Sequence, residues 1–238
     1  MRVLVLCDDT WHPAATVRQG LARLQAARGG ARSSPSGRRL AFEFLEDGAA
    51  WSAARMGEFP LVILAKANIM SAKNHQPWLG VDLQQAFPDY VRRGNGLLVI
   101  HGGTSRYEKL PAMNALLGGA FVRHPEQCLV TVEPEPRHPL AAGVSPFTVR
   151  DEHYFMAMGD PQADVFLQAR SEHGVQPAGW TRAHGKGRVC VLTPGHNLEV
   201  WLNPGFQRLL SNALNWSANA AWARTERARR AGEAPALR

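Results

Sequence analysis

Histidine and carboxylate side chains recur in this sequence close after short apolar runs. His101, for example, comes directly after the run LLVI at 97–100. The residues that stand out in this way are His12, His101, His124, Glu152 and His196. Imidazole and carboxylate groups together suit Zn²⁺, Mn²⁺ or Fe²⁺, and the same groups transfer protons near neutral pH. The residue types therefore indicate a divalent-metal or acid–base site.

The spacing between these residues is long and irregular, and the sequence has no HExxH or CxxC motif. A lone histidine beside an apolar run is more often a hydrogen-bonded loop residue than a ligand. The prediction of a site therefore depends on all five residues converging in the fold. Four other histidines are interpreted as turn or solvated loop residues: His75, His138, His173 and His184.

The segment HGGTS at 101–105 does not match other known site motifs. It lacks the GxxxxGK[ST] pattern of a phosphate-binding loop and the GxGxxG pattern of a dinucleotide site, so no nucleotide cofactor is predicted. The chain has no GxSxG motif, which argues against a serine hydrolase. Gly102 and Gly103 are interpreted as residues that allow a tight turn.

The elements that must position these residues alternate between apolar runs and helical patterns in the first half of the chain. Strands are predicted at 3–7, 40–45, 61–65 and 97–100, with helices at 14–27 and 82–93. Three of these runs are continuously apolar, as parallel strands covered on both faces are, whereas 40–45 alternates and is placed near an edge. Strands separated by helices predict a parallel sheet. Ligands bind beyond the carboxyl ends of such strands, where the polar residues fall.

The second half of the chain predicts further elements, whose arrangement the sequence leaves open between two alternatives. A helix is expected at 110–117, strands at 129–132, 147–150, 165–169 and 189–192, and a final helix at 204–222. These strands either extend the sheet or form a small antiparallel layer. We predict a single α/β domain over 1–222, with an Arg/Gly/Ser loop at 28–39 and a basic, disordered tail at 223–238.

Composition excludes several classes of protein. The net charge of +7 comes entirely from two arginine-rich segments, 28–39 and 223–238, so no nucleic-acid partner is predicted. No apolar run approaches the roughly 20 residues of a membrane span, and the first residues do not form a secretory signal. We therefore expect a cytoplasmic protein. The three cysteines form no spaced pair and are interpreted as free thiols.

Several longer segments together resemble the ThuA-like (trehalose utilisation) family. They are WLGVDLQQAFPDYVRRGNGLLVIHGG at 78–103, GGAFVRHP, HPLAAGV, RDEHYFM, GKGRVCVLTPGH and NPGFQRLLSNALNW, and they occur in the family's order. The resemblance covers about residues 1–218. It implies a class I glutamine amidotransferase-like, flavodoxin-like fold, a three-layer sandwich with a mainly parallel central sheet, and a role in carbohydrate metabolism.

True amidotransferases of this fold carry a nucleophilic cysteine in a sharp turn after a central strand. Here the corresponding strand is followed by His101, and Cys7, Cys128 and Cys190 all lie elsewhere in the sequence. Without a thiolate no thioester forms, so glutaminase chemistry is excluded.

The polar residues that lie inside motifs matching the family are His12, His101, His124, Asp151, Glu152, Tyr154 and His196. The roles expected of single residues combine these matches with positions at strand ends, such as that of Lys66. Catalytic roles are expected for Glu152, Asp151, His12 and Tyr154. A divalent metal is expected on His101, His124 and His196, with Glu152 as a further possible ligand. Lys66, Trp180 and Trp201 are expected to bind substrate, with core packing as the alternative for the two tryptophans.

The expected activity is metal-assisted isomerisation, or related proton transfer, on a keto-sugar supplied by a partner sugar dehydrogenase. Hydrolysis and elimination are close alternatives. A different class remains open, namely a non-catalytic protein that binds a sugar or the dehydrogenase. The final helix, with Trp216 and Trp222, offers apolar surface for a homo-oligomer, although interior packing of both side chains is an equal alternative.

Overall fold

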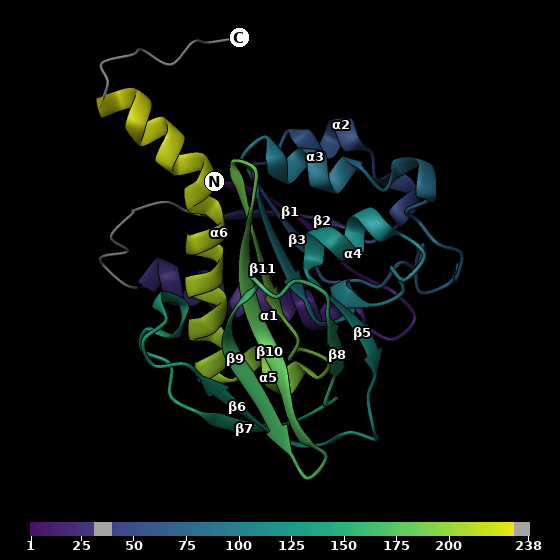
Figure 1. The fold of residues 1–238 in the computed structure, drawn as a ribbon, viewed down its shortest axis with the longest axis vertical. Coiled ribbons are helices and arrows are strands. Elements are labelled where there is room, and N and C mark those ends of the chain that lie inside the picture. Colours follow the sequence, from purple (N-terminus) through teal and green to yellow (C-terminus); the bar gives the residue numbers. More distant parts are fainter. Residues whose placement is uncertain (31–39, 231–238) are drawn as a thin grey trace.

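The chain folds around one large sheet with helices on both faces (Figure 1). The computed structural model describes residues 1–30 and 40–230. Within these residues the large sheet has nine strands in the order β2-β1-β3-β4-β11-β10-β9-β6-β7, and β5 and β8 pair separately. The protein is therefore an α/β protein with a large mixed sheet at its centre.

Five neighbouring strands of the sheet are parallel; the sequence predicted this for the first four and left the fifth, at 189–192, open. They are β2 (Ala41–Leu45), β1 (Arg2–Leu6), β3 (Leu61–Leu64), β4 (Gly96–Ile100) and β11 (Gly187–Leu192). Side chains of β1 alternate between two cores: Val3 and Val5 pack on one face, and Leu4 and Leu6 on the other. Burying each such side chain contributes about 1.5–3 kcal/mol, which explains the continuous apolar runs. β2 is the edge strand that its alternating pattern indicated.

The remaining four strands extend the same sheet in antiparallel fashion. They are β10 (Gly174–His184), β9 (Asp164–Ser171), β6 (Cys128–Pro134) and β7 (Phe147–Asp151). The small sheet consists of β5 (Gly119–Arg123) and β8 (Phe155–Met158). The sequence did not predict β10, because Pro177 and Gly179 interrupt its pattern; register irregularities occur at these residues.

Two groups of helices cover the two faces of the sheet. One group consists of α1 (Ala14–Gly30), α5 (Leu198–Leu202) and α6 (Pro204–Arg230), and the other of α2 (Ala53–Gly57), α3 (Ala86–Arg92) and α4 (Pro111–Leu117). Short 3-10 turns lie at Gly48–Ala50, Val81–Leu83, His101–Thr104 and Pro139–Ala141. No described helix is long and apolar enough to span a membrane.

Three boundaries differ from those expected. The helix predicted at 82–93 is divided into a 3-10 turn and α3, because Pro88 has no N–H to continue a helix from residue 84. Helix α1 ends at Gly30, and residues 31–39 of the expected Arg/Gly/Ser loop lie outside the described residues. Helix α6 continues to Arg230, beyond the expected end, and residues 231–238 of the expected tail are also not described.

The apolar residues of α6 pack inward where their side chains are described. Phe206, Leu210 and Leu214 are buried, and Trp216 packs against the same core with the Arg188 guanidinium 5.0 Å from its ring centroid. Trp222 lies outside the residues whose side chains are described. Trp216 therefore follows the interior-packing alternative.

Candidate metal centre

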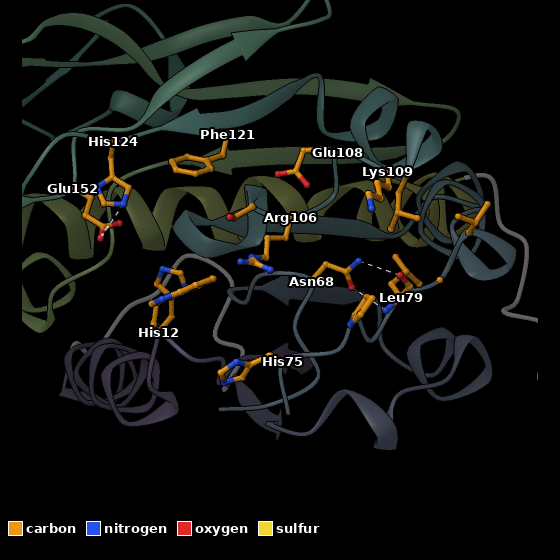
Figure 2. A pocket seen from close by; sticks show the side chains of 16 residues that line it. His12, Asn68, His75, Leu79, Arg106, Glu108, Lys109, Phe121, His124 and Glu152 are labelled. Atoms are coloured by element: carbon orange, nitrogen blue, oxygen red, sulfur yellow. Dashed lines mark hydrogen bonds and ion pairs between the residues drawn. The ribbon is translucent and has the colours of Figure 1, made fainter. Parts of the chain in front are cut away.

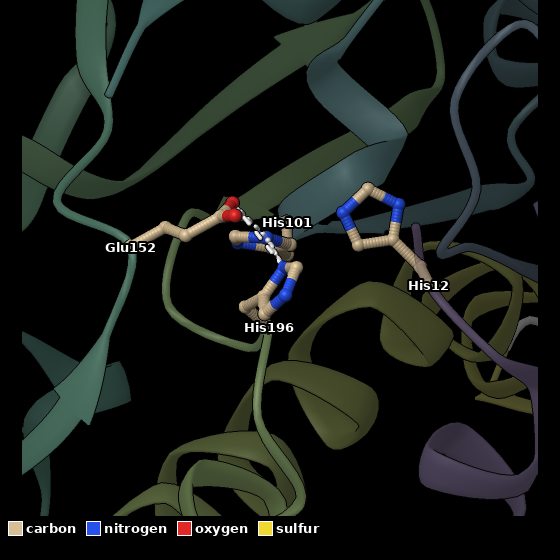
Figure 3. Close-up of side chains that lie close together, drawn as sticks. All are labelled: His12, His101, Glu152 and His196. Carbon is tan, nitrogen blue, oxygen red and sulfur yellow. Dashed lines mark hydrogen bonds and ion pairs between the residues drawn. The ribbon is translucent and has the colours of Figure 1, made fainter. Parts of the chain in front are cut away.

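Four of the predicted residues meet at the carboxyl ends of the parallel strands (Figure 3). They are His12 after β1, His101 after β4, Glu152 between β7 and β8, and His196 after β11. One potential ligand atom from each lies within 4.8 Å of those of the others. The convergence on which the sequence prediction depended is therefore present for these four residues.

His12 is held by a turn that the sequence reading did not single out. Its Nδ1 donates to both carboxylate oxygens of Asp9, each at 2.9 Å. Asp9 is almost fully buried and also accepts from the backbone N–H groups of Trp11, His12 and Ala67. Because Nδ1 carries the donated proton, the lone pair of His12 is on Nε2, and the imidazole faces the other three residues (Figure 3). Asp9 is thus a positioning residue.

His101 occupies a strained turn directly after β4. Its φ is 47°, in the left-handed region that non-glycine residues rarely adopt. A Cβ on Gly102 would overlap the His12 ring, and one on Gly103 would overlap the Leu64 carbonyl oxygen, so the interpretation of HGG as a tight turn is confirmed. His101 Nδ1 donates to the Thr193 carbonyl at 2.7 Å, which leaves the Nε2 lone pair for the centre.

Glu152 and His196 complete the cluster. Glu152 Oε2 lies 3.2 Å from His101 Nε2 and 3.2 Å from His196 Nδ1. The loop that carries His196 is fixed by Asp151, whose buried carboxylate accepts from the N–H groups of Gly195 and His196 at 2.9 and 3.0 Å. Asp151 therefore holds the backbone and does not face the centre as a catalytic group would.

Burial and hydrogen bonding set the ionisation of these groups. Burial opposes the charged form of Glu152, but the neighbouring imidazoles of His101 and His196 outweigh it and hold the pKa of this carboxyl well below its usual range. The hydrogen bond to Glu152 raises the pKa of His196. Burial lowers the pKa of His12, despite the hydrogen bond to Asp9. Glu152 is accordingly an anion at neutral pH, which is the form that binds a cation.

The donor set fits a divalent metal ion. His101 Nε2, with its proton on Nδ1, faces the carboxylate of Glu152 and lies 3.3 Å from His196 Nδ1. Lone pairs that point at one another require a proton or a cation between them. The hydrogen bonds from His12 to Asp9 and from His101 to a carbonyl are also those that fix the ring orientation of metal-bound histidines. Three imidazoles and one carboxylate suit zinc and similar ions.

His124 and Tyr154 lie beside the cluster. His124 Nε2 is 3.5 Å from the second oxygen of Glu152, and its Nδ1 donates to the Pro125 carbonyl. It is exposed and does not belong to the four-residue group. The Tyr154 ring stacks on His101 at 4.1 Å between centroids, and burial raises the pKa of its hydroxyl well above the ordinary value.

The three expected substrate-binding residues lie apart from the cavity described below. Lys66 is buried and its Nζ donates to the carbonyls of Glu46 and Met70. Trp180 is fully buried and donates to the Leu117 carbonyl. Trp201, behind the histidines, donates to the Gly195 carbonyl and belongs to the core. For the tryptophans these positions match the core-packing alternative.

A cavity of about 780 Å³ opens beside the centre (Figure 2). His12, Glu152 and His124 line one end of it. Its other lining residues include Trp11, Asn68, His75, Arg106, Glu108, Lys109 and Phe121. Sequence reasoning missed the role of this second group, since exposed polar residues in loops have no pattern that assigns them to a cavity. Its size is in the range of small-molecule sites.

The comparison with protein families agrees with this architecture. A profile of the ThuA family, described as trehalose utilisation, matches residues 2–217. The chain therefore belongs to the ThuA family. A comparison with curated protein sequences finds no match.

Solved structures share the fold. A ThuA-like protein from Parabacteroides merdae superposes with a TM-score of 0.70 at 17% identity, covering 92% of this chain and 90% of that chain. One from Bacteroides uniformis gives 0.67 at 17% identity, covering 91% of each chain. A cytoplasmic protein from Salmonella typhimurium gives 0.62 at 13% identity, covering 91% of this chain and 99% of that one. At such identities the likeness concerns the fold alone.

The turn after β4 has a histidine where an amidotransferase of the expected fold would have its cysteine. Cys7 and Cys190 are buried, and burial raises the pKa of the Cys7 thiol to about 12. Cys128 is half-buried, on β6. None of the three lines the cavity.

Proposed function

We propose that this protein is a divalent-metal enzyme that transfers protons on a keto-sugar, with isomerisation as the reaction. His12, His101, Glu152 and His196 would hold the ion. The observation that carries the proposal is the convergence of these four side chains, two of them oriented by hydrogen bonds to Asp9 and to the Thr193 carbonyl. A bound divalent ion polarises a carbonyl and stabilises negative charge on its oxygen.

The chain's own residues would supply binding and proton transfer. Phe121 and Trp11 line the cavity and offer aromatic faces to a sugar ring. His124, next to Glu152 and outside the ligand set, is placed to take the proton from the carbon beside the ketone and return it to the former carbonyl carbon. The hydroxyl group on that neighbouring carbon gives its proton to the former carbonyl oxygen, so the ketone moves by one position with no net change in electrons.

This assignment revises the roles expected from the sequence. His12 and Glu152 move from catalysis to ion binding, because both belong to the converging group. His124 moves from ion binding to acid–base work. Asp151 and Tyr154 become positioning residues for the His196 loop and for the His101 ring.

We also propose a flavodoxin-like, amidotransferase-like fold and a cytoplasmic location. The order of the five parallel strands, β2-β1-β3-β4-β11, supports the first, since it is the doubly wound order of flavodoxin-like sheets. The cytoplasmic Salmonella protein of similar fold supports the second. A sugar dehydrogenase would supply the keto-sugar.

The test is elemental analysis of the purified protein, followed by isomerase assays on keto-sugars. We expect near-stoichiometric zinc, manganese or iron in the wild type, and loss of the ion in His101→Ala and Glu152→Ala. His124→Ala is the matched control, a cavity histidine that should keep the ion and lose turnover. Absence of metal from the wild type after reloading would refute the metal role and favour a non-catalytic sugar-binding protein.

A further inference from the structure

The cavity carries two cationic side chains that the proposed metal centre does not use. Arg106 and Lys109 both come from the loop between the 3-10 turn after β4 and helix α4, and both line the cavity. In Figure 2 Arg106 lies between the end with His12 and Glu152 and the end with Lys109. Both residues are exposed, so their charges are accessible to a ligand in solution.

Arg106 is held in a strained conformation from both sides. Its φ is 64°, in the left-handed region. The residue before it is fixed by a hydrogen bond from the Asn68 N–H to the Ser105 carbonyl at 3.1 Å. The residue after it is fixed by the buried Tyr107 hydroxyl, which donates to the Lys66 carbonyl at 3.1 Å. Strain retained at a cavity wall is typical of functional positions.

The guanidinium of Arg106 is also stacked. It lies 4.8 Å from the centroid of the Trp11 ring, and Trp11 is itself 45% exposed at the cavity. Stacking on an aromatic face leaves the N–H groups at the rim of the guanidinium available to a second partner. The pair therefore presents an oriented donor group beside the end of the cavity that His12, Glu152 and His124 line, called the metal end below.

The charges of the cavity are not balanced within the described part of the chain. Neither Arg106 nor Lys109 forms an ion pair with any described residue, although other surface arginines, such as Arg170, do. Glu108 is the one further carboxylate that lines the cavity, because Glu152 is already engaged by histidines. A divalent ion at the centre would add more positive charge. The cavity is thus electrostatically suited to an anion.

We propose that the substrate of this cavity is an acidic sugar derivative, whose carboxylate or phosphate group pairs with the guanidinium of Arg106. Lys109 adds attraction without a fixed geometry. The placement of that sugar's reacting keto group at the metal end rests on the proposed function. The anion subsite itself does not require the metal. Arginine suits both anions because its planar fork donates two parallel hydrogen bonds to either.

The experiment is isothermal titration calorimetry with two matched, unreactive sugars. Methyl α-D-glucuronide and methyl α-D-glucoside differ only in a carboxylate against a hydroxymethyl group at C6. We expect the wild type to bind the glucuronide about tenfold more tightly than the glucoside, which is the gain that one charge-assisted pair provides. In Arg106→Ala that preference should vanish, and in Arg106→Lys part of it should remain. Arg170→Ala, an exposed arginine outside the cavity, is the control and should retain it in full.

A second matched pair, glucose 6-phosphate and glucose, separates the two anions. If only the phosphate pair shows a preference that depends on Arg106, the group recognised is a phosphate. Equal binding within both pairs, or a preference unchanged in Arg106→Ala, would overturn the proposal. Circular dichroism of each variant establishes that it is folded, and Arg106→Lys remains informative if the alanine variant is not.

All titrations are run on protein treated with a chelator and again after zinc is restored. An anion preference in both forms, with no zinc taken up by the wild type on reloading, would refute the metal centre and leave the anion subsite standing. Metal retention without an anion preference would refute the subsite alone. The two proposals are therefore tested separately.

Discussion

The two ends of the cavity are built in opposite ways. At the metal end the four clustered side chains are buried or half-buried. Asp9 and the Thr193 carbonyl fix the second ring nitrogens of His12 and His101, and Asp151 fixes the backbone at His196. At the other end Arg106, Lys109 and Trp11 are exposed, and the two cations lack ion-pair partners among the described residues. Rigid geometry serves an ion that requires fixed distances, whereas accessible charge serves recognition of a ligand. Substitutions at the two ends should therefore have different consequences.

The largest effect is expected from adding a methyl group inside the tight turn of the metal end. In Gly103→Ala the new Cβ would overlap the Leu64 backbone carbonyl, which cannot move without disturbing β3. We expect a loss of about 3 kcal/mol or more in the free energy of unfolding, at the upper end of overpacking effects. Urea denaturation followed by circular dichroism measures it.

Gly57→Ala is the control for this substitution. Nothing lies within 4 Å of a Cβ at Gly57, which ends helix α2, so a gain of about 0.5 kcal/mol is expected. Equal stability of the two variants would show that the turn after β4 is not tightly packed.

The second prediction concerns the orientation of His12. Asp9→Asn keeps the shape of the side chain but removes the charge that holds the Nδ1 proton. Zinc affinity, measured by competition with a chelating dye, should fall about 10–100-fold. Asp8→Asn is the matched control, because Asp8 accepts from the Ala14 N–H at the start of α1 and asparagine caps equally well. An affinity that falls equally in both variants would contradict the role of Asp9.

The third prediction is the pH dependence of ion binding. The hydrogen bond to Glu152 raises the pKa of His196, so in the absence of an ion His196 keeps its proton above the ordinary histidine value of about 6.5. An ion displaces that proton, so affinity should rise with pH until His196 is deprotonated, by up to about tenfold per pH unit for one proton. Calorimetry in buffers of different ionisation enthalpy counts the protons released. No release near pH 6.5 would show that His196 is neutral before the ion binds.

The sequence predicted the metal end better than the rest of the cavity, for a physical reason. Buried parallel strands appear as apolar runs, and the residues after them share one edge of the sheet, so His12, His101 and His196 could be placed together. Hydrogen-bond partners follow no such periodicity. Asp9 was therefore missed, although it lies three residues before His12 in the same turn.

Aromatic and cationic residues were harder to assign from the sequence. Trp180 and Trp201 lie in segments that match the family, yet both are core residues whose indole N–H groups bond to carbonyls. Trp11 and Arg106 gave no signal, because exposure and a left-handed φ depend on contacts made across the fold. Which side of the backbone a loop residue faces is decided by tertiary packing, and a single sequence does not specify it.

The smallest effect is expected at the exposed end, and it sharpens the contrast between the two ends. Trp11→Ala removes a side chain that is 45% exposed, so unfolding free energy should change by no more than about 0.5 kcal/mol. Zinc content should be unchanged, since Trp11 provides no ligand atom: its backbone N–H to Asp9 is kept in the variant, and its ring meets the His12 ring only edge-on, at 6.5 Å between centroids. Both methyl glycosides should bind a few-fold more weakly, because a sugar face and the stacking of Arg106 are lost together.

Val81→Ala, at another exposed position of the cavity wall, is the control for Trp11→Ala and should leave both glycosides bound as in the wild type. If Trp11→Ala also lost its zinc, the exposed end would be part of the metal scaffold, and the separation of the two ends would fail. If binding weakened only for the glucuronide, Trp11 would act through Arg106 alone. In that case the aromatic face would orient the cation without contacting the sugar.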